Sequence, residues 1–243
     1  LSVIRLNDAF TEALQAGVQA MGWRPLVPFA PALTQKVQAI RDSVEAKPSA
    51  NAKTGAIVKA VTGTLIDLES ELNALDAKVG DGDTGSTFAL GARDIAKLLS
   101  EKMLPLKEPA ALLLLAGERL ATVMGGSSGV LMSIFFTSAG QKLTEDATLA
   151  DALLAGLAQM KHYGGAELGD RTLIDALQPA LEALKKKDLA AAAKAAQKGA
   201  DATAKMGKAN AGRSSYVGSD NLEGVKDPGA VAVAAVFAAL TKG

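Results

Sequence analysis

Residues 56–86 read AIVKAVTGTLIDLESELNALDAKVGDGDTGS, and this stretch decides the class of fold. Its apolar residues recur at alternating steps of three and four, the period of a helix with one buried stripe: Val58, Val61, Leu65, Leu68, Leu72 and Leu75. The same period continues downstream, at about 84–100, 108–123, 128–142, 148–163, 171–185, 188–206 and 229–241. We find no convincing strand pattern, so the sequence predicts an all-α domain with eight core helices.

The composition agrees with helices that pack closely. Of the 243 residues, 49% are hydrophobic but only 4% are aromatic, so alanine, leucine, valine and isoleucine must build the core. Lys plus Arg and Asp plus Glu number 26 each, which argues against a nucleic-acid or acidic-membrane partner. The absence of cysteine excludes disulfides and thiolate metal sites, and it fits a cytoplasmic location.

The first part of the chain, residues 1–51, is predicted to be a linker or extension that precedes a domain spanning 52–243. Its amphipathic stretch contains Leu6, Phe10, Ala13 and Leu14, and the prolines of WRPLVPFAP then prevent a regular helix. A short helix at about 31–45 ends at the polar linker EAKPSANAKTG. Because the chain begins with leucine rather than methionine, we expect it to be a fragment of a longer polypeptide.

Glycine, serine and aspartate gather in alternate junctions between the predicted helices. Short connections make consecutive helices antiparallel, so alternate junctions should share one rim of the bundle. The junctions of that rim are VGDGDTGS, MGGSSG, YGGAELGDRT and AGRSSYVGSDNLEGVKDPGA, whereas LKEPA, TEDAT and KKKD at the other rim are plain polar turns. This asymmetry predicts a functional site at one end of the bundle.

Three carboxylates crowd the first of these junctions: Asp76, Asp81 and Asp83. Two carboxylates about 5 Å apart repel each other by roughly 3 kcal/mol at an effective dielectric constant near 20. Asp76 also lies at a predicted helix C-terminus, where the helix dipole disfavours negative charge. A bound cation would offset both effects, and an all-oxygen ligand set that includes substrate phosphates is typical of Mg²⁺.

The other junctions can bind an anion or simply cap helices. Helix N-termini offer free N–H groups, Ser127 and Ser128 add hydroxyls, and Arg171 and Arg213 can pair with phosphate. In the plain interpretation, GGSSG holds a C-cap glycine and a serine N-cap, while Asp170 and Asp227 are N-caps, the latter before proline at the first helical position. Four such loops on one rim favour a magnesium–nucleotide site.

Several familiar motifs do not fit. Gly80, Gly82 and Gly85 match G-x-G-x-x-G formally, but a helix precedes them and aspartates lie between them. No loop has the EF-hand register, and no P-loop motif is present. The single histidine, His162, lacks the partners for zinc or triad chemistry, so a capping or packing role is expected.

The ordered motifs LDAKVGDGDTGS, MGGSSG, YGGAELGDRTLIDAL, GRSSY and DPGA identify a family resemblance over residues 52–243. The chain resembles the nucleotide-binding (L-type) domain of dihydroxyacetone kinases, as found in the C-terminal half of the single-chain, ATP-dependent enzymes. The resemblance implies a barrel of eight antiparallel helices, and it implies that Asp76, Asp81 and Asp83 hold Mg²⁺, two ions by expectation. The residues that it places around ATP or ADP are Asp83, Thr84, Gly85, Ser86, Gly126, Ser127, Ser128, Gly164, Arg171, Thr172, Arg213, Asp227, Pro228 and Gly229.

The implied reaction is γ-phosphoryl transfer from ATP to the hydroxyl of dihydroxyacetone, with Asp76, Asp81, Asp83 and Arg171 in the catalytic set. Family members bind the triose through a histidine of another domain, and His162 lies in no matching motif. We therefore expect this chain alone to bind nucleotide but to phosphorylate dihydroxyacetone poorly or not at all. Its expected partners are that substrate-binding domain and a second copy of the intact enzyme.

Two alternatives stay open. The chain could be a subunit that keeps ADP as a cofactor recharged by a phosphotransferase system. Such subunits stand alone, however, whereas residues 1–51 resemble the connector from the preceding substrate-binding domain of the single-chain enzymes. It could instead be a non-catalytic nucleotide- or lipid-binding module, because a barrel lined by alanine, leucine and valine has few aromatics to fill it.

Overall fold

The computed structural model describes residues 8–16 and 47–242, and the chain divides between residues 42 and 43 into two units that are treated separately. In the first unit, α1 (Asp8–Gln15) covers most of the predicted amphipathic stretch. The proline-rich WRPLVPFAP segment and the short helix predicted at 31–45 lie outside the described residues. The domain boundary after residue 51 stays a prediction.

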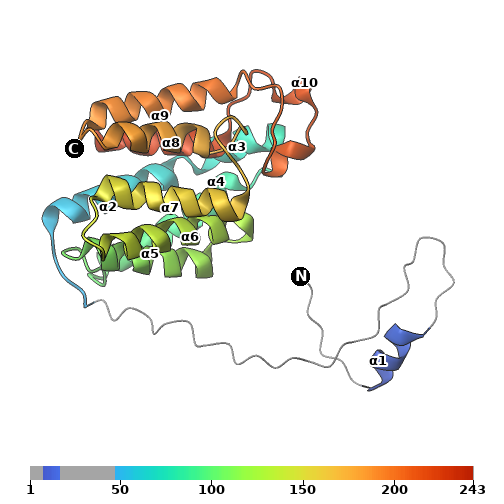
Figure 1. Cartoon of the computed structure of the whole chain (residues 1–243), viewed down its shortest axis with the longest axis horizontal. Coiled ribbons are helices and arrows are strands. Elements are labelled where there is room, and N and C mark those ends of the chain that lie inside the picture. The colour runs from blue at the N-terminus through green and yellow to red at the C-terminus, as the bar shows by residue number, and fades with distance from the viewer. Residues whose placement is uncertain (1–7, 17–46, 243) are drawn as a thin grey trace. The chain divides into compact units, whose positions relative to one another are not determined.

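The second unit is a bundle of helices (Figure 1). In chain order these are α2 (Ala52–Asp67), α3 (Glu69–Val79), α4 (Thr84–Ser100), α5 (Pro109–Val123), α6 (Gly126–Leu143), α7 (Leu149–Gly164), α8 (Ile174–Leu184), α9 (Leu189–Thr203), η1 (Arg213–Tyr216), α10 (Ser219–Leu222) and α11 (Pro228–Leu240). Over residues 8–16 and 47–242 there is no β-strand, only one isolated bridge between Ser49 and Pro105. The all-α prediction is confirmed.

The first predicted core helix is wrong in one respect, because it is two helices. The helical ladder is interrupted at Leu68, which ends α2 and begins α3. The apolar stripe runs through this break, and its residue Leu72 is fully buried. Just after the break, Glu69 forms an ion pair with Arg93 of α4 and accepts a hydrogen bond from Ser86. Tertiary contacts to α4 therefore fix the direction of α3 independently of α2.

Two helix starts differ from the prediction by two residues or more. Helix α6 begins at Gly126, two residues early, and α8 begins at Ile174, three residues late. The late start leaves Arg171 and Thr172 in a loop instead of in the first turn of a helix. The short elements η1 and α10 were not predicted, since four-residue helices carry no readable period.

Small residues let the helices approach one another closely. The core around α8 and α9 contains Ala176, Ala180, Ala192 and Ala196, all fully buried. A Cβ atom added at Gly199 of α9 would lie 2.0 Å from the carbonyl oxygen of Asp175 in α8. This close packing is what an alanine-rich, aromatic-poor composition predicts.

The junctions between helices divide into two groups at opposite ends of the bundle (Figure 1). The connections α3–α4, α5–α6, α7–α8 and α9–α11 lie at the end where α10 is drawn, and we call residues 80–83, 124–125, 165–173 and 204–227 the glycine-rich end. The C-terminus and the polar turns between α6 and α7 and between α8 and α9 lie at the other end. Within the described part of the chain, no helix is both long and apolar enough to cross a membrane.

Candidate functional site

The three predicted carboxylates come together at the glycine-rich end. Asp76 lies in the last turn of α3, and Asp81 and Asp83 lie in the loop before α4. One oxygen from each carboxylate lies within 4.8 Å of the others; Asp76 is buried while Asp81 and Asp83 are exposed. Three carboxylate oxygens at this separation are a donor set that fits a hard divalent cation such as Mg²⁺.

Asp76 is held by the backbone of the next helix. Its Oδ2 accepts hydrogen bonds from the N–H groups of Asp83, at 2.9 Å, and Thr84, at 3.1 Å. The carboxylate therefore lies at the C-terminus of α3 and also at the N-terminus of α4, where a helix favours negative charge. The expected position at a helix C-terminus is confirmed, but the expectation was incomplete because it considered only the helix that carries Asp76.

The glycines of this loop are needed for close contacts. A Cβ at Gly80 would lie 2.3 Å from Oδ1 of Asp76, and a Cβ at Gly85 would lie 2.0 Å from the carbonyl oxygen of Glu69. Gly82 has a φ of +80°, a backbone conformation that favours glycine. Glycine at these three positions allows the loop to approach Asp76 closely and the start of α4 to pack against α3.

The electrostatics of the cluster also favour a cation. The pKa of Asp83 is raised, first because neighbouring atoms partly desolvate this otherwise exposed carboxylate and then by the charges of Asp81 and Asp76. Arg213 of η1 opposes this effect, and its Nη2 lies 3.1 Å from Oδ2 of Asp81. The predicted residue Arg213 thus reaches the acidic loop from a distant part of the sequence.

The start of α4 is anchored by α3. The N–H of Ser86 donates to Oδ1 of Asn73 at 3.0 Å, and its hydroxyl donates to Oε1 of Glu69 at 3.1 Å. Asn73 in turn donates to Oγ of Ser86 at 2.9 Å. Ser86 is therefore tied to α3, and sequence analysis missed Asn73 although it lies one helical turn before Asp76.

The start of α6 has a different form. Gly125 is the N-cap and Gly126 follows it with a φ of +65°, so the predicted serine N-cap is wrong. Ser127 and Ser128 lie in the first turn of α6 with exposed side chains, and no side chain caps this helix. Uncapped N–H groups beside two hydroxyls can bind an oxyanion by donating hydrogen bonds to it.

The burial and backbone conformation of the predicted residue Arg171 are the least expected features of the site. Its side chain is fully buried, its φ is +60°, and its Nη2 donates to the carbonyl oxygen of Val225 at 2.7 Å. Its Nε and Nη1 are buried without a hydrogen-bond partner. Burial lowers the pKa of this guanidinium, and the nearby charge of Asp227 raises it. Buried donors without acceptors are costly, and a bound anion would satisfy them.

The loop around Arg171 is held from both sides. Asp170 accepts from the Asn210 side chain at 2.8 Å and from the N–H of Glu167 at 2.7 Å, so it is not the predicted N-cap of α8. The N-cap position is Leu173, which makes no side-chain cap bond. The N–H of Ile174 donates to Oγ1 of Thr172 at 3.2 Å, and Asp175 accepts from the N–H of Thr172 at 2.8 Å. Asp175 lies in the first turn only because α8 starts three residues later than predicted.

At α11 the predicted cap is confirmed. Oδ1 of Asp227 accepts from the N–H of Ala230 at 2.7 Å, and Pro228 occupies the first turn. Burial raises the pKa of Asp227 to about 7, with Ala230 and Arg171 acting in the opposite direction. A Cβ at Gly229 would lie 3.1 Å from Cβ of Leu173, so this helix start packs directly on the α7–α8 loop.

Other predicted features lie at the edge of this arrangement or outside it. Gly164 is the last residue of α7 and packs against Leu131 of α6. His162 is exposed, and its ring meets that of Tyr163 edge-on at 4.9 Å between centroids, a packing contact rather than a core position.

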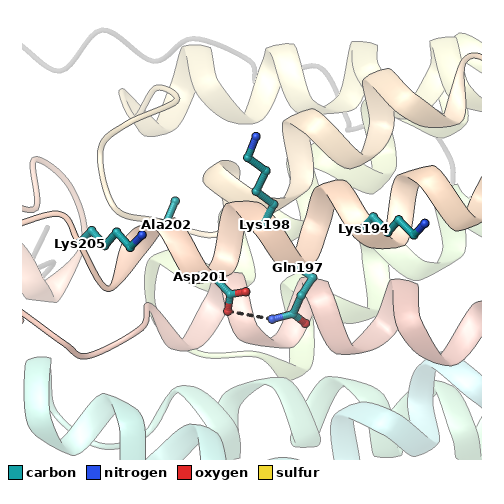
Figure 2. Close-up of a pocket in the computed structure, with 6 residues that line it drawn as sticks. All are labelled: Lys194, Gln197, Lys198, Asp201, Ala202 and Lys205. Atoms are coloured by element: carbon teal, nitrogen blue, oxygen red, sulfur yellow. Dashed lines mark hydrogen bonds between the residues drawn. The ribbon is translucent and has the colours of Figure 1, made fainter.

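A hollow on the outer face of α9 contains none of the predicted site residues (Figure 2). It is lined by Lys194, Gln197, Lys198, Asp201, Ala202 and Lys205. Gln197 donates to Asp201 at 2.9 Å, and Asp201 also pairs with Lys226 at 2.6 Å. This is the solvated face of an amphipathic helix.

Comparison with known proteins agrees with this fold. The family model described as "DAK2 domain" matches residues 78–242, and the chain belongs to this family. It is 55% identical to the dihydroxyacetone kinase of Citrobacter freundii over the whole of this chain and 44% of that protein. It is 40% identical to the human triokinase/FMN cyclase over 98% of this chain and 43% of that protein.

Solved structures give the same relationship. The crystal structure of the C. freundii dihydroxyacetone kinase in its native form matches with a TM-score of 0.78 and 52% identity, over 98% of this chain and 43% of that one. The structure of the same enzyme in complex with AMP-PNP and Mg²⁺ matches with a TM-score of 0.76, over 98% and 42%. This chain therefore spans less than half the length of the relatives that it matches.

Proposed function

We propose that this chain is the nucleotide-binding part of an ATP-dependent dihydroxyacetone kinase. The observation that carries the proposal is the meeting of three carboxylates with the start of α4, in a family whose member from C. freundii was crystallised with AMP-PNP and Mg²⁺. Dihydroxyacetone as the phosphoryl acceptor is taken from the name of that relative. The acceptor would be held by a part of the whole enzyme that lies outside this chain.

Asp76, Asp81 and Asp83 would hold magnesium, and two ions are proposed because three carboxylates are available. Bound there, the metal would neutralise phosphate charge, which is the main requirement of phosphoryl transfer. Asp76 has a second task, because its carboxylate also orients the N–H groups of Asp83 and Thr84.

The remaining residues would surround the nucleotide. Ser127 and Ser128 would contact phosphate from the uncapped start of α6, next to Gly126. Arg171 would offer its two unpartnered nitrogens to phosphate oxygens, and so it is proposed as the charged catalytic group of this chain. The list is completed by residues whose backbone lies at the same end: Thr84, Gly85, Ser86, Gly164, Thr172, Arg213, Asp227, Pro228 and Gly229.

Metal binding without nucleotide tests the acidic cluster by itself. We would titrate Mn²⁺, a paramagnetic substitute for Mg²⁺, into the chain and follow the free ion by electron paramagnetic resonance. Asp83→Asn should weaken binding at least tenfold, roughly the effect of removing one charged ligand. The matched control is Asp188→Asn, an N-cap at the other end of the bundle whose Oδ1 accepts from Ala191 at 2.8 Å. Equal loss in both variants, or no binding by the wild type, would contradict the proposal.

Turnover tests the division of labour between this chain and the rest of the enzyme. The chain alone should bind ATP but form little or no dihydroxyacetone phosphate, because the acceptor site is proposed to lie elsewhere. Near-full turnover by the chain alone would refute this. Nucleotide retained through purification would favour an ADP-cofactor subunit, and lipid in an organic extract would favour a lipid-binding role. Cytoplasmic location and a dimer of the intact enzyme stay predictions.

A further inference from the structure

A buried carboxylate next to the Arg171 loop has no part in the proposed nucleotide contacts. Asp175 is the second residue of α8, and 3% of its surface is exposed. Its Oδ1 accepts the N–H of Gly169 at 2.6 Å, and its Oδ2 accepts the N–H of Thr172 at 2.8 Å. One side chain thus holds the backbone on both sides of Arg171.

The conformation of Arg171 requires such support. A residue with a Cβ is disfavoured at a φ of +60°, and it stays there only where its surroundings fix it. Residues Gly169 and Thr172 flank Arg171 closely, so the two bonds to Asp175 constrain this backbone directly. The result is a guanidinium that is fully buried, with one nitrogen bonded to Val225 and two without a partner.

The carboxylate is itself on a rigid support. The backbone of Asp175 lies against Gly199 of α9, where a Cβ would come within 2.0 Å of its carbonyl oxygen. On the other side of the loop, Asp170 is bonded to Asn210. Both oxygens of Asp175 accept hydrogen bonds from backbone N–H groups, and these bonds stabilise a buried carboxylate near a proposed phosphate site.

We propose that Asp175 is a positioning residue that fixes the Arg171 guanidinium toward the nucleotide phosphates by holding residues 169–172. The inference rests on the proposed function, and it adds a residue that contacts no ligand. It predicts that Asp175 affects nucleotide binding only through Arg171.

A double-mutant cycle tests this dependence. Asparagine has one acceptor oxygen and a donor amide, so Asp175→Asn should release one of the two N–H groups. We would measure the affinity of the chain for magnesium ADP by calorimetry in the wild type, Asp175→Asn, Arg171→Met and the double variant. Each single variant should bind about tenfold or more weakly, and the double variant should bind no more weakly than Arg171→Met. Asp188→Asn at the other end of the bundle should leave affinity unchanged.

A second variant perturbs the same loop without altering a buried charge. Gly169 is exposed and has a φ of +100°, so Gly169→Ala strains the loop from the surface. It should also weaken binding in the wild type and have no further effect in Arg171→Met. Additive losses in either cycle, or unchanged affinity in Asp175→Asn, would overturn the inference. Unchanged affinity for magnesium ADP in Arg171→Met would overturn the inference about Asp175 but not the proposed nucleotide-binding function. A wild type that binds no nucleotide would overturn both.

Discussion

Asp227→Asn should remove a pH dependence from the folding stability of this chain. Burial raises the pKa of Asp227 to about 7 in the folded state, against an ordinary value of 3.8 for an aspartate. Between these values the folded protein holds a proton that the unfolded chain has lost, so the free energy of unfolding falls as pH rises. A difference of about 3 pKa units at 1.36 kcal/mol each gives a loss of about 4 kcal/mol, complete above pH 7.

Urea unfolding of the wild type and of Asp227→Asn between pH 4 and pH 8, without metal or nucleotide, measures this effect. Asparagine keeps the acceptor for the N–H of Ala230, so the helix cap survives while the titration is lost. The variant should gain stability relative to the wild type as pH rises, by about 4 kcal/mol in total. Asp188→Asn is the control, because it makes the same change at the exposed N-cap of α9. If the free energies of unfolding of Asp227→Asn and of the wild type differ by the same amount at every pH in this range, the reasoning is refuted.

Three other substitutions test the packing of glycines and the role of Arg213. Gly85→Ala should destabilise the fold by about 3 kcal/mol or more, because the added Cβ would lie 2.0 Å from the backbone oxygen of Glu69. Gly63→Ala in α2 should instead stabilise the fold by up to about 1 kcal/mol, because the added Cβ meets nothing within 4 Å. Thermal unfolding of the pair checks this, and equal changes would contradict it. Arg213→Ala should change the free energy of unfolding by less than about 1 kcal/mol, because the side chains of Arg213 and Asp81 in this ion pair are 73% and 37% exposed. The same variant should bind Mn²⁺ more tightly in the absence of nucleotide, because a positive charge next to Asp81 is removed. Weaker Mn²⁺ binding in that variant would show that Arg213 does not compete with the cation.

Helical periodicity was sufficient to predict the class of fold. The i, i+3 and i+4 pattern located α4 at its observed bounds and the other core helices within a few residues. It could not locate the break at Leu68, because the apolar stripe continues through it and the cause lies in contacts of Glu69 with α4. Local patterns report which face is buried, but the direction of a segment depends on its partners.

Short connections and glycine content were likewise sufficient to place the loops at one end. The charges within the site were harder to interpret, because their partners are distant in the sequence. Arg213 lies 3.1 Å from Asp81, and Arg171 bonds to Val225; no local pattern connects these residues. The cap that Asp76 provides to α4 was missed for the same reason.

Asp175 shows why a site cannot be fully predicted from motifs. The residue lies within the family motif stretch RTLIDAL, where helical periodicity predicts only that it is part of a helix. Its role depends on the late start of α8 and on the left-handed backbone of Arg171, and neither can be read from composition or spacing. A buried aspartate in a first helical turn is a sign that a preceding loop needs support.

Calorimetric titration of ATP into this chain, with Mg²⁺ and with EDTA, tests the central claim most directly. The wild type should bind ATP in a magnesium-dependent manner, Asp83→Asn should lose this binding, and Asp188→Asn should keep it. These results would establish the acidic cluster as a metal–nucleotide site. Equal binding with and without metal, or no binding at all, would contradict the proposed function and leave the aspartates with a structural role alone.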